Sequence, residues 1–79
     1  MPGPVKRSVM IAGHATSISL EPAFWNALQR AAGEEALPLN ALVARIDAAR
    51  IREPDPANLA SAIRVWLLER ATGDSLHGG

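Results

Sequence analysis

One short segment of strict alternation limits the folds available to this chain of 79 residues. Between Thr16 and Leu20, apolar and polar side chains alternate, which predicts a β-strand. The predicted faces are Thr16, Ile18 and Leu20 on one side and Ser17 and Ser19 on the other. A lone strand satisfies neither its backbone hydrogen bonds nor its apolar face, and even an isolated two-stranded hairpin is marginal. The strand therefore needs a partner.

The sequence allows two partner strands for the predicted strand 16–20. The short apolar run 9–12 could fold back across Gly13, or a strand could come from a second chain. The residues Gly13-His14 are a poor sequence for a tight hairpin turn. We therefore favour pairing between two chains.

The sequence after Leu20 has the pattern of three helices. Glu21-Pro22 suits a helix start, and this first helix should end between Gly33 and Ala36. Pro38 stands at the start of a second helix, which runs to Arg52 because Pro54 stops it. Asp55 as N-cap and Pro56 at the first position predict a third helix that continues to Ala71. The predicted fold class is mainly α with one β-strand.

The predicted organisation is one small domain. We expect a flexible arm over residues 1–6, a folded domain over 7–72 and a disordered tail over 73–79. A domain of this size buries only about 60% of its unfolded surface, and the chain has no cysteine for a disulfide or a thiolate zinc site. A second copy of the chain that completes the core would bury more surface and so stabilise the fold.

The charge is distributed unevenly. The formal net charge is zero, which is unlike a typical nucleic-acid binder. The first twenty residues, however, contain the cations Lys6 and Arg7 and no acidic side chain, whereas every carboxylate side chain lies from Glu21 onward. The N-terminal segment is therefore locally basic.

Catalytic, metal and membrane functions find little support. The chain has no cysteine or tyrosine, no phosphate-binding loop and no HExxH spacing. Its two histidines, His14 and His77, are too few for a metal site. The longest apolar runs are too short for a signal peptide or a membrane span. We expect a cytoplasmic protein that is not an enzyme and needs no cofactor.

Several motifs in this order resemble those of a known family. They are Lys6–Ser8, Gly13–Glu21, Phe24–Trp25, Leu39–Val43, Ile46–Arg50 and Asn58–Arg64. Over roughly residues 6–70 the chain resembles a small bacterial subfamily of ribbon-helix-helix proteins, the Arc and MetJ class of DNA-binding domains.

The resemblance implies a homodimer. In such proteins two chains pair their strands into an antiparallel two-stranded ribbon above the paired helices, and the ribbon enters the major groove of DNA. The dimer core would then contain Ile18, Leu20, Phe24, Trp25, Leu28, Leu42, Val43 and Ile46. The third C-terminal helix exceeds the minimal plan and would pack across the dimer or build a higher assembly.

The resemblance also implies a set of DNA contacts, which are Lys6, Arg7, Ala15, Ser17, Ser19, Leu39 and Asn40. The outward strand face would read bases, the N-terminal cations would contact phosphates, and the start of the second helix would bind a phosphate through backbone N–H groups. Ala15 stands where relatives often have arginine, and Pro38 stands where they prefer serine.

These observations predict a dimeric transcriptional regulator that binds double-stranded DNA. The alternative is a protein-interaction or antitoxin-like dimerisation module with weak or no DNA binding. That alternative is favoured by Ala15, Pro38 and the neutral overall charge.

Overall fold

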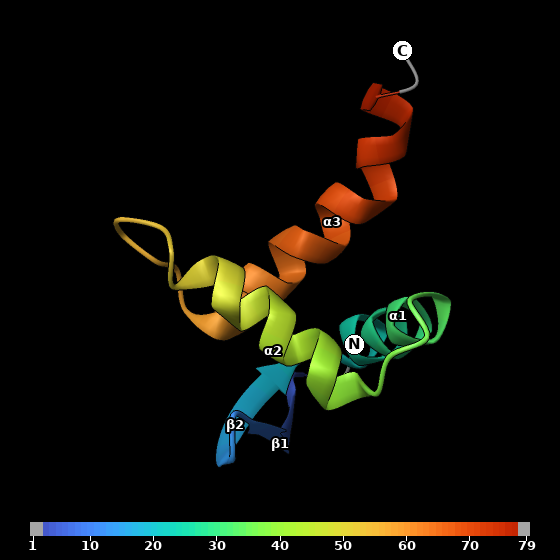
Figure 1. Cartoon of the computed structure of the whole chain (residues 1–79). Coiled ribbons are helices and arrows are strands. Elements are labelled where there is room, and N and C mark those ends of the chain that lie inside the picture. The colour runs from blue at the N-terminus through green and yellow to red at the C-terminus, as the bar shows by residue number, and fades with distance from the viewer. Residues whose placement is uncertain (1–2, 78–79) are drawn as a thin grey trace.

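The computed structural model describes residues 3–77 of the chain, and the side chains of residues 3–73. Two strands are followed by three helices (Figure 1): β1 Val5–Ile11, β2 His14–Leu20, α1 Pro22–Glu34, α2 Leu39–Arg50 and α3 Leu59–His77. The two strands form one antiparallel ribbon. The order of a ribbon followed by three helices confirms the predicted plan in part.

The partner of the predicted strand lies in the same chain. β1 pairs with β2 from Val5↔Leu20 to Ile11↔His14, so the expectation of a single strand is wrong and each chain has a two-stranded ribbon of its own. The reversal occurs one residue earlier than the Gly13-His14 turn considered from the sequence. Ala12 and Gly13 both have positive φ, 51° and 83°, as a two-residue type I′ turn requires. Alanine is an uncommon residue in that conformation, which is why the sequence does not suggest the turn.

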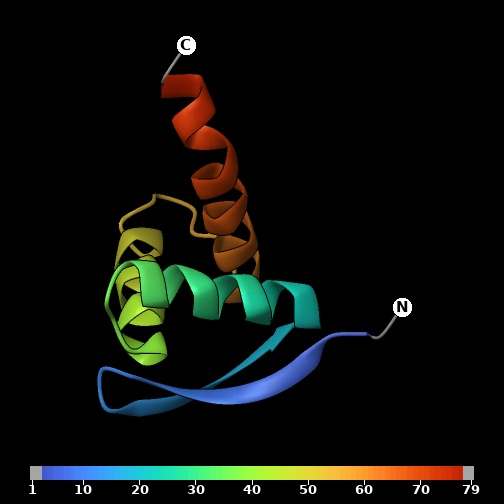
Figure 2. The same ribbon diagram turned by 90° about the vertical axis from the view of Figure 1, so that its right-hand side faces the viewer.

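The ribbon has a buried face and an exposed face. Val9 and Ile11 of β1 and Ile18 and Leu20 of β2 lie on the same side and are buried, Leu20 completely. This side packs against the helices. Figure 2 shows the ribbon along one side of the molecule, with α1 crossing above it and α3 directed away. The other face of the ribbon is therefore turned away from the helices.

Local sequence sets both ends of α1. At the start, Pro22 occupies the first turn and the Glu21 carbonyl accepts the first intrahelical hydrogen bonds. At the end, the Ala36 N–H donates to the Gly33 carbonyl (3.1 Å) and the Leu37 N–H to the Ala32 carbonyl (2.9 Å). This pair of hydrogen bonds, with Ala36 at φ 56°, is a Schellman motif. The predicted start and end of this helix are confirmed.

The other helix boundaries differ from the prediction. α2 ends at Arg50, with Ile51 as its C-cap. α3 begins at Leu59, and its cap is Asn58, whose Oδ1 accepts the Ser61 N–H at 2.8 Å. The predicted start of this helix at Asp55-Pro56 is wrong, because a competing asparagine cap lies three residues further along the chain.

The ends of the ordered elements also extend further than expected. Val5 and Lys6, expected in a flexible arm, belong to β1. Residues 73–77, expected in a disordered tail, belong to α3. Residues 3–4 of the predicted arm belong to neither a helix nor a strand, and residues 1–2 and 78–79 lie outside the described residues.

The core lies between the ribbon and the helices and is built within one chain. Of the eight predicted core residues, seven are buried and Phe24 is partly buried, and all eight belong to a single cluster that also contains Ile63 and Leu67 of α3. Trp25 is 1% exposed, and its indole N–H donates to the Val5 carbonyl at 2.8 Å. α1 is thereby tied to the beginning of β1. Within residues 3–77, no helix is both long and apolar enough to cross a membrane.

Candidate nucleic-acid interface

The outward face of the ribbon is formed by three cross-strand pairs. The pairs are Lys6↔Ser19, Ser8↔Ser17 and Met10↔Ala15. All six side chains are exposed except that of Ser19, which is half-buried. The predicted base-reading residues Ala15, Ser17 and Ser19 therefore do lie together on one face.

The two N-terminal cations lie on opposite faces of β1. Lys6 is on the outward face, whereas Arg7 pairs with Ile18 on the inner one. The Arg7 guanidinium carbon lies 5.1 Å from the centroid of the Trp25 ring, a cation–π contact at the margin of the core. Successive side chains of a strand point to opposite faces, so Lys6 and Arg7 lie on different faces just as Ser17 and Ile18 do.

The outward face offers three kinds of contact. The serine hydroxyls donate and accept hydrogen bonds, Lys6 provides a positive charge, and Met10 with Ala15 provides apolar contact. Hydroxyls and methyl-sized groups are suited to base edges, and a lysine is suited to phosphates. The face can therefore hold a polyanion that also displays polar and apolar groups.

Met10 and Ser8 are members of this face that the sequence interpretation missed. The sequence places Met10 in a short apolar run, and its alternation is clear only in the second strand. Once Val9 and Ile11 are placed inward, their neighbours Ser8 and Met10 must point outward. The alternation in Arg7–Ile11 is the signal that could have shown this.

In Figure 2 the start of α2 lies just above the ribbon, on the side of the helices. Its cap, Pro38, makes no side-chain hydrogen bond, and its carbonyl accepts the N–H groups of Ala41 (3.1 Å) and Leu42 (3.2 Å). Among the described residues, the N–H groups of Leu39 and Asn40 have no backbone acceptor, as expected for a first helical turn. These two groups point their positive dipole out of the helix start.

A comparison with family models decides the classification. The model for the ribbon-helix-helix domain matches residues 4–71. The chain belongs to the ribbon-helix-helix family. Members of this family are typically regulators without enzymatic activity that dimerise and bind DNA, or they are antitoxin-like. No curated protein and no solved structure matches the chain.

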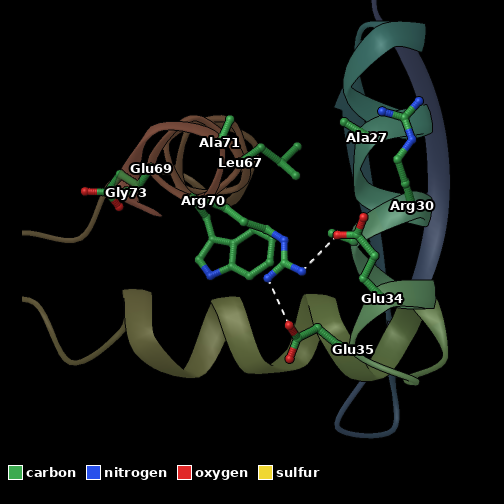
Figure 3. Close-up of a pocket in the computed structure, with 11 residues that line it drawn as sticks. Ala27, Arg30, Glu34, Glu35, Leu67, Glu69, Arg70, Ala71 and Gly73 are labelled. Carbon is green, nitrogen blue, oxygen red and sulfur yellow. Dashed lines mark hydrogen bonds and ion pairs between the residues drawn. The ribbon is translucent and has the colours of Figure 1, made fainter. Parts of the chain in front are cut away.

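This ribbon-helix-helix chain has a charged cleft between α1 and α3 (Figure 3). The cleft measures about 780 Å³. Arg70 of α3 crosses it and donates to Glu34 at 3.0 Å and to Glu35 at 2.9 Å, and Arg45 of α2 reaches Glu35 at 3.3 Å. Hydrogen bonds from Arg70 and then Arg45 lower the pKa of Glu35. The cleft residues thus join the three helices by ion pairs.

A second surface between α1 and α3 is apolar. This apolar groove, of about 430 Å³, is lined by Ala23, Phe24, Ala27, Arg64, Val65, Leu67, Leu68 and Ala71. Val65 is 52% exposed and Leu68 is 63% exposed. At the groove's margin, the Arg64 side chain donates to Glu21 at 2.9 Å and lies over the Phe24 ring. The pKa of Glu21 is lowered by a backbone hydrogen bond and by this arginine.

Proposed function

We propose that this protein is a homodimeric transcriptional regulator that binds double-stranded DNA through the outward face of its ribbon. The observation that supports this most directly is the composition of that face. Lys6 and three serines lie on a two-stranded ribbon, and the first twenty residues contain no carboxylate side chain. The major groove of B-DNA is about 12 Å wide and admits a two-stranded ribbon.

In this proposal each contact has a separate task. Ser17 and Ser19 form hydrogen bonds with base edges, which specify sequence weakly because the side chains are short. Lys6 contacts a phosphate, and the free N–H groups of Leu39 and Asn40 contact another. Arg7, with its guanidinium over Trp25, contributes positive charge at the sheet margin. The phosphate contacts orient the ribbon on the DNA, and the serine contacts to base edges provide the sequence specificity.

The proposed dimer forms through the free edge of β2. Residues that flank a two-residue hairpin turn form a hydrogen-bonded pair, and such pairs alternate with non-bonded ones. From the register, the backbone groups of Ala15, Ser17 and Ser19 therefore point away from β1. This edge has no charged residue and no proline, whereas β1 contains Lys6 and Arg7 and follows Pro4. Charges and proline protect an edge strand from pairing, so β2 is the edge suited to a second copy.

Two-fold pairing of β2 with the partner's β2 would give a four-stranded sheet. The two central strands would present Ser17 and Ser19 of both copies to the groove. The outer strands would lie at its margins, with Lys6 toward the phosphates and Met10 toward the base edges. This proposal keeps a ribbon contributed by two chains at the centre, with an intramolecular hairpin on each side.

The DNA-binding proposal is tested with a pair of charge-removing variants. Lys6→Gln removes a cation from the outward face, and Arg52→Gln removes one from the α2–α3 connection, which lies away from the ribbon in both views (Figures 1 and 2). Fluorescence anisotropy with a labelled duplex should show weaker binding for Lys6→Gln, with a shallower salt dependence, and wild-type binding for Arg52→Gln. Equal effects of the two substitutions would contradict the proposed placement of DNA.

The dimer proposal is tested with a pair of proline variants. Ser17→Pro removes an N–H group that points out of the β2 edge, and Ser8→Pro removes its counterpart at the β1 edge. Neither change removes a β1–β2 hydrogen bond. Sedimentation velocity should show that Ser17→Pro dissociates the dimer while Ser8→Pro leaves it intact. Intact dimers of Ser17→Pro, or a monomeric wild-type chain, would refute pairing through β2.

A second function, a protein-interaction or antitoxin-like module, is favoured by the apolar groove. Val65 and Leu68 are three residues apart on α3 and expose apolar surface of the kind that receives an amphipathic helix. Leu68→Glu introduces a charge there without touching the ribbon. Under the leading proposal this variant keeps DNA affinity. Under the second one, the wild-type chain captures a stoichiometric protein partner without nucleic acid, and Leu68→Glu loses that partner.

A further inference from the structure

One part of the outward ribbon face is apolar. Met10 and Ala15 lie directly opposite each other at the turn end of the ribbon, and Met10 is 53% exposed. Opposed residues of an antiparallel pair have Cβ atoms about 4.5–5.5 Å apart, so the two side chains form one continuous apolar spot. The rest of the face consists of three serines and Lys6.

The protein's own core does not use this spot. Val9 and Ile11, the neighbours of Met10 in the chain, are buried on the inner face, and the strand alternation directs Met10 away from them. An exposed methionine is a flexible and polarizable side chain that adapts to irregular apolar surfaces. Its position beside serines, on the face proposed to enter the major groove, indicates that the apolar surface it meets belongs to the DNA.

The major groove offers one apolar group, the C5-methyl group of thymine. The same position is unsubstituted in cytosine. Apart from Lys6, which is proposed above to contact a phosphate, the outward face of the described ribbon contains none of the side chains that pair with guanine or adenine through two hydrogen bonds. Apolar contact is therefore the main means by which this face can distinguish one base pair from another.

Resting on the DNA-binding function proposed above, we propose that Met10 and Ala15 contact the C5-methyl groups of pyrimidines in the major groove. The protein then prefers A·T-rich sites because of their methyl groups. Burial of one methyl group changes affinity by about fourfold, and two copies acting on two methyl groups by about 15-fold.

The test uses one duplex of mixed sequence, about 20 base pairs or two helical turns long. It is prepared with thymine or with deoxyuridine, and with cytosine or with 5-methylcytosine. Only the major-groove methyl groups differ among the four forms. Anisotropy titrations of the wild-type chain should show about 15-fold weaker binding when thymine is replaced by deoxyuridine, and stronger binding when cytosine is methylated.

Two variants identify the side chains responsible. Met10→Ser combined with Ala15→Ser should bind the thymine and deoxyuridine duplexes equally, because the double substitution removes both apolar contacts. Ser8→Ala, at a neighbouring position on the same face, should keep the wild-type preference. Circular dichroism of both variants checks that the fold is intact.

The outcomes separate this inference from the proposed function. Wild-type binding that is the same for all four duplexes would overturn the methyl contact and leave DNA binding standing. A methyl preference that survives in the variant with both Met10→Ser and Ala15→Ser would also overturn it. Absence of binding to every duplex would refute the DNA-binding function itself.

Discussion

The turn between β1 and β2 gives the sharpest stability prediction. Ala12 has φ 51°, a left-handed conformation that costs an L-residue other than glycine about 1–2 kcal/mol. Asparagine tolerates this conformation, and Asn-Gly is the preferred sequence of a type I′ turn. Ala12→Asn should therefore stabilise the protein by about 1 kcal/mol, which raises Tm by about 4–8 °C in a domain of this size. Ala12→Val should destabilise it, because a β-branched residue is a pronounced outlier at positive φ.

Thermal unfolding followed by circular dichroism measures both variants, with all samples at one protein concentration because dimerisation shifts Tm. Gly13→Ala serves as a second probe of the turn, since Gly13 has φ 83°. It should lower Tm. If the segment were instead extended and paired with another chain, Ala12→Val would be neutral or stabilising, because valine favours strands. A higher Tm for Ala12→Val than for Ala12→Asn would refute the hairpin.

Three further predictions concern the helices. Ala36→Gly should raise Tm in the same assay, because glycine removes the strain of φ 56° at the end of α1. Trp25→Phe should lower the free energy of unfolding by about 1–3 kcal/mol in urea titrations, because the Val5 carbonyl loses its indole donor. Glu35→Gln should destabilise the protein at neutral pH and low salt. Its ion pairs lower the pKa of Glu35 below 4.5, so this stabilisation is complete above that pH and is lost as pH falls through the lowered value. The difference between Glu35→Gln and wild type should therefore disappear in strong acid and shrink in high salt, and a pH-independent difference would contradict the ion-pair explanation.

The helical part of the fold can be predicted from the sequence because its signals are local. Pro22 marks the start of α1, and the apolar spacing along the helices identifies the residues that form the core. The outward placement of Ser17 and Ser19 follows from alternation alone. In each case the residues close in sequence to a position determine its secondary structure and whether its side chain is buried.

The features that the sequence did not predict are the hairpin, the start of α3 and the orientation of Arg7. They depend on competition between local signals or on contacts between residues distant in sequence. The hairpin depends on Ala12 accepting a disfavoured backbone conformation, for which the pairing of seven residues on each strand compensates. At the start of α3, two plausible caps compete, and Asn58 prevails over Asp55. The inward orientation of Arg7 follows only once β1 is recognised as a strand, since its partner Trp25 is distant in sequence.

The central claim is that the ribbon face binds DNA through a small number of phosphate contacts. In the proposed dimer, Lys6, or Lys6 and Arg7, of each copy would neutralise two to four phosphates in total, and affinity should fall by about tenfold to about 100-fold between 50 and 200 mM salt. The deciding measurement is a fluorescence anisotropy titration of a labelled duplex at these two salt concentrations. We predict binding near micromolar protein at low salt that weakens by this factor. Absence of binding at low salt, or affinity that does not change with salt, would contradict the account.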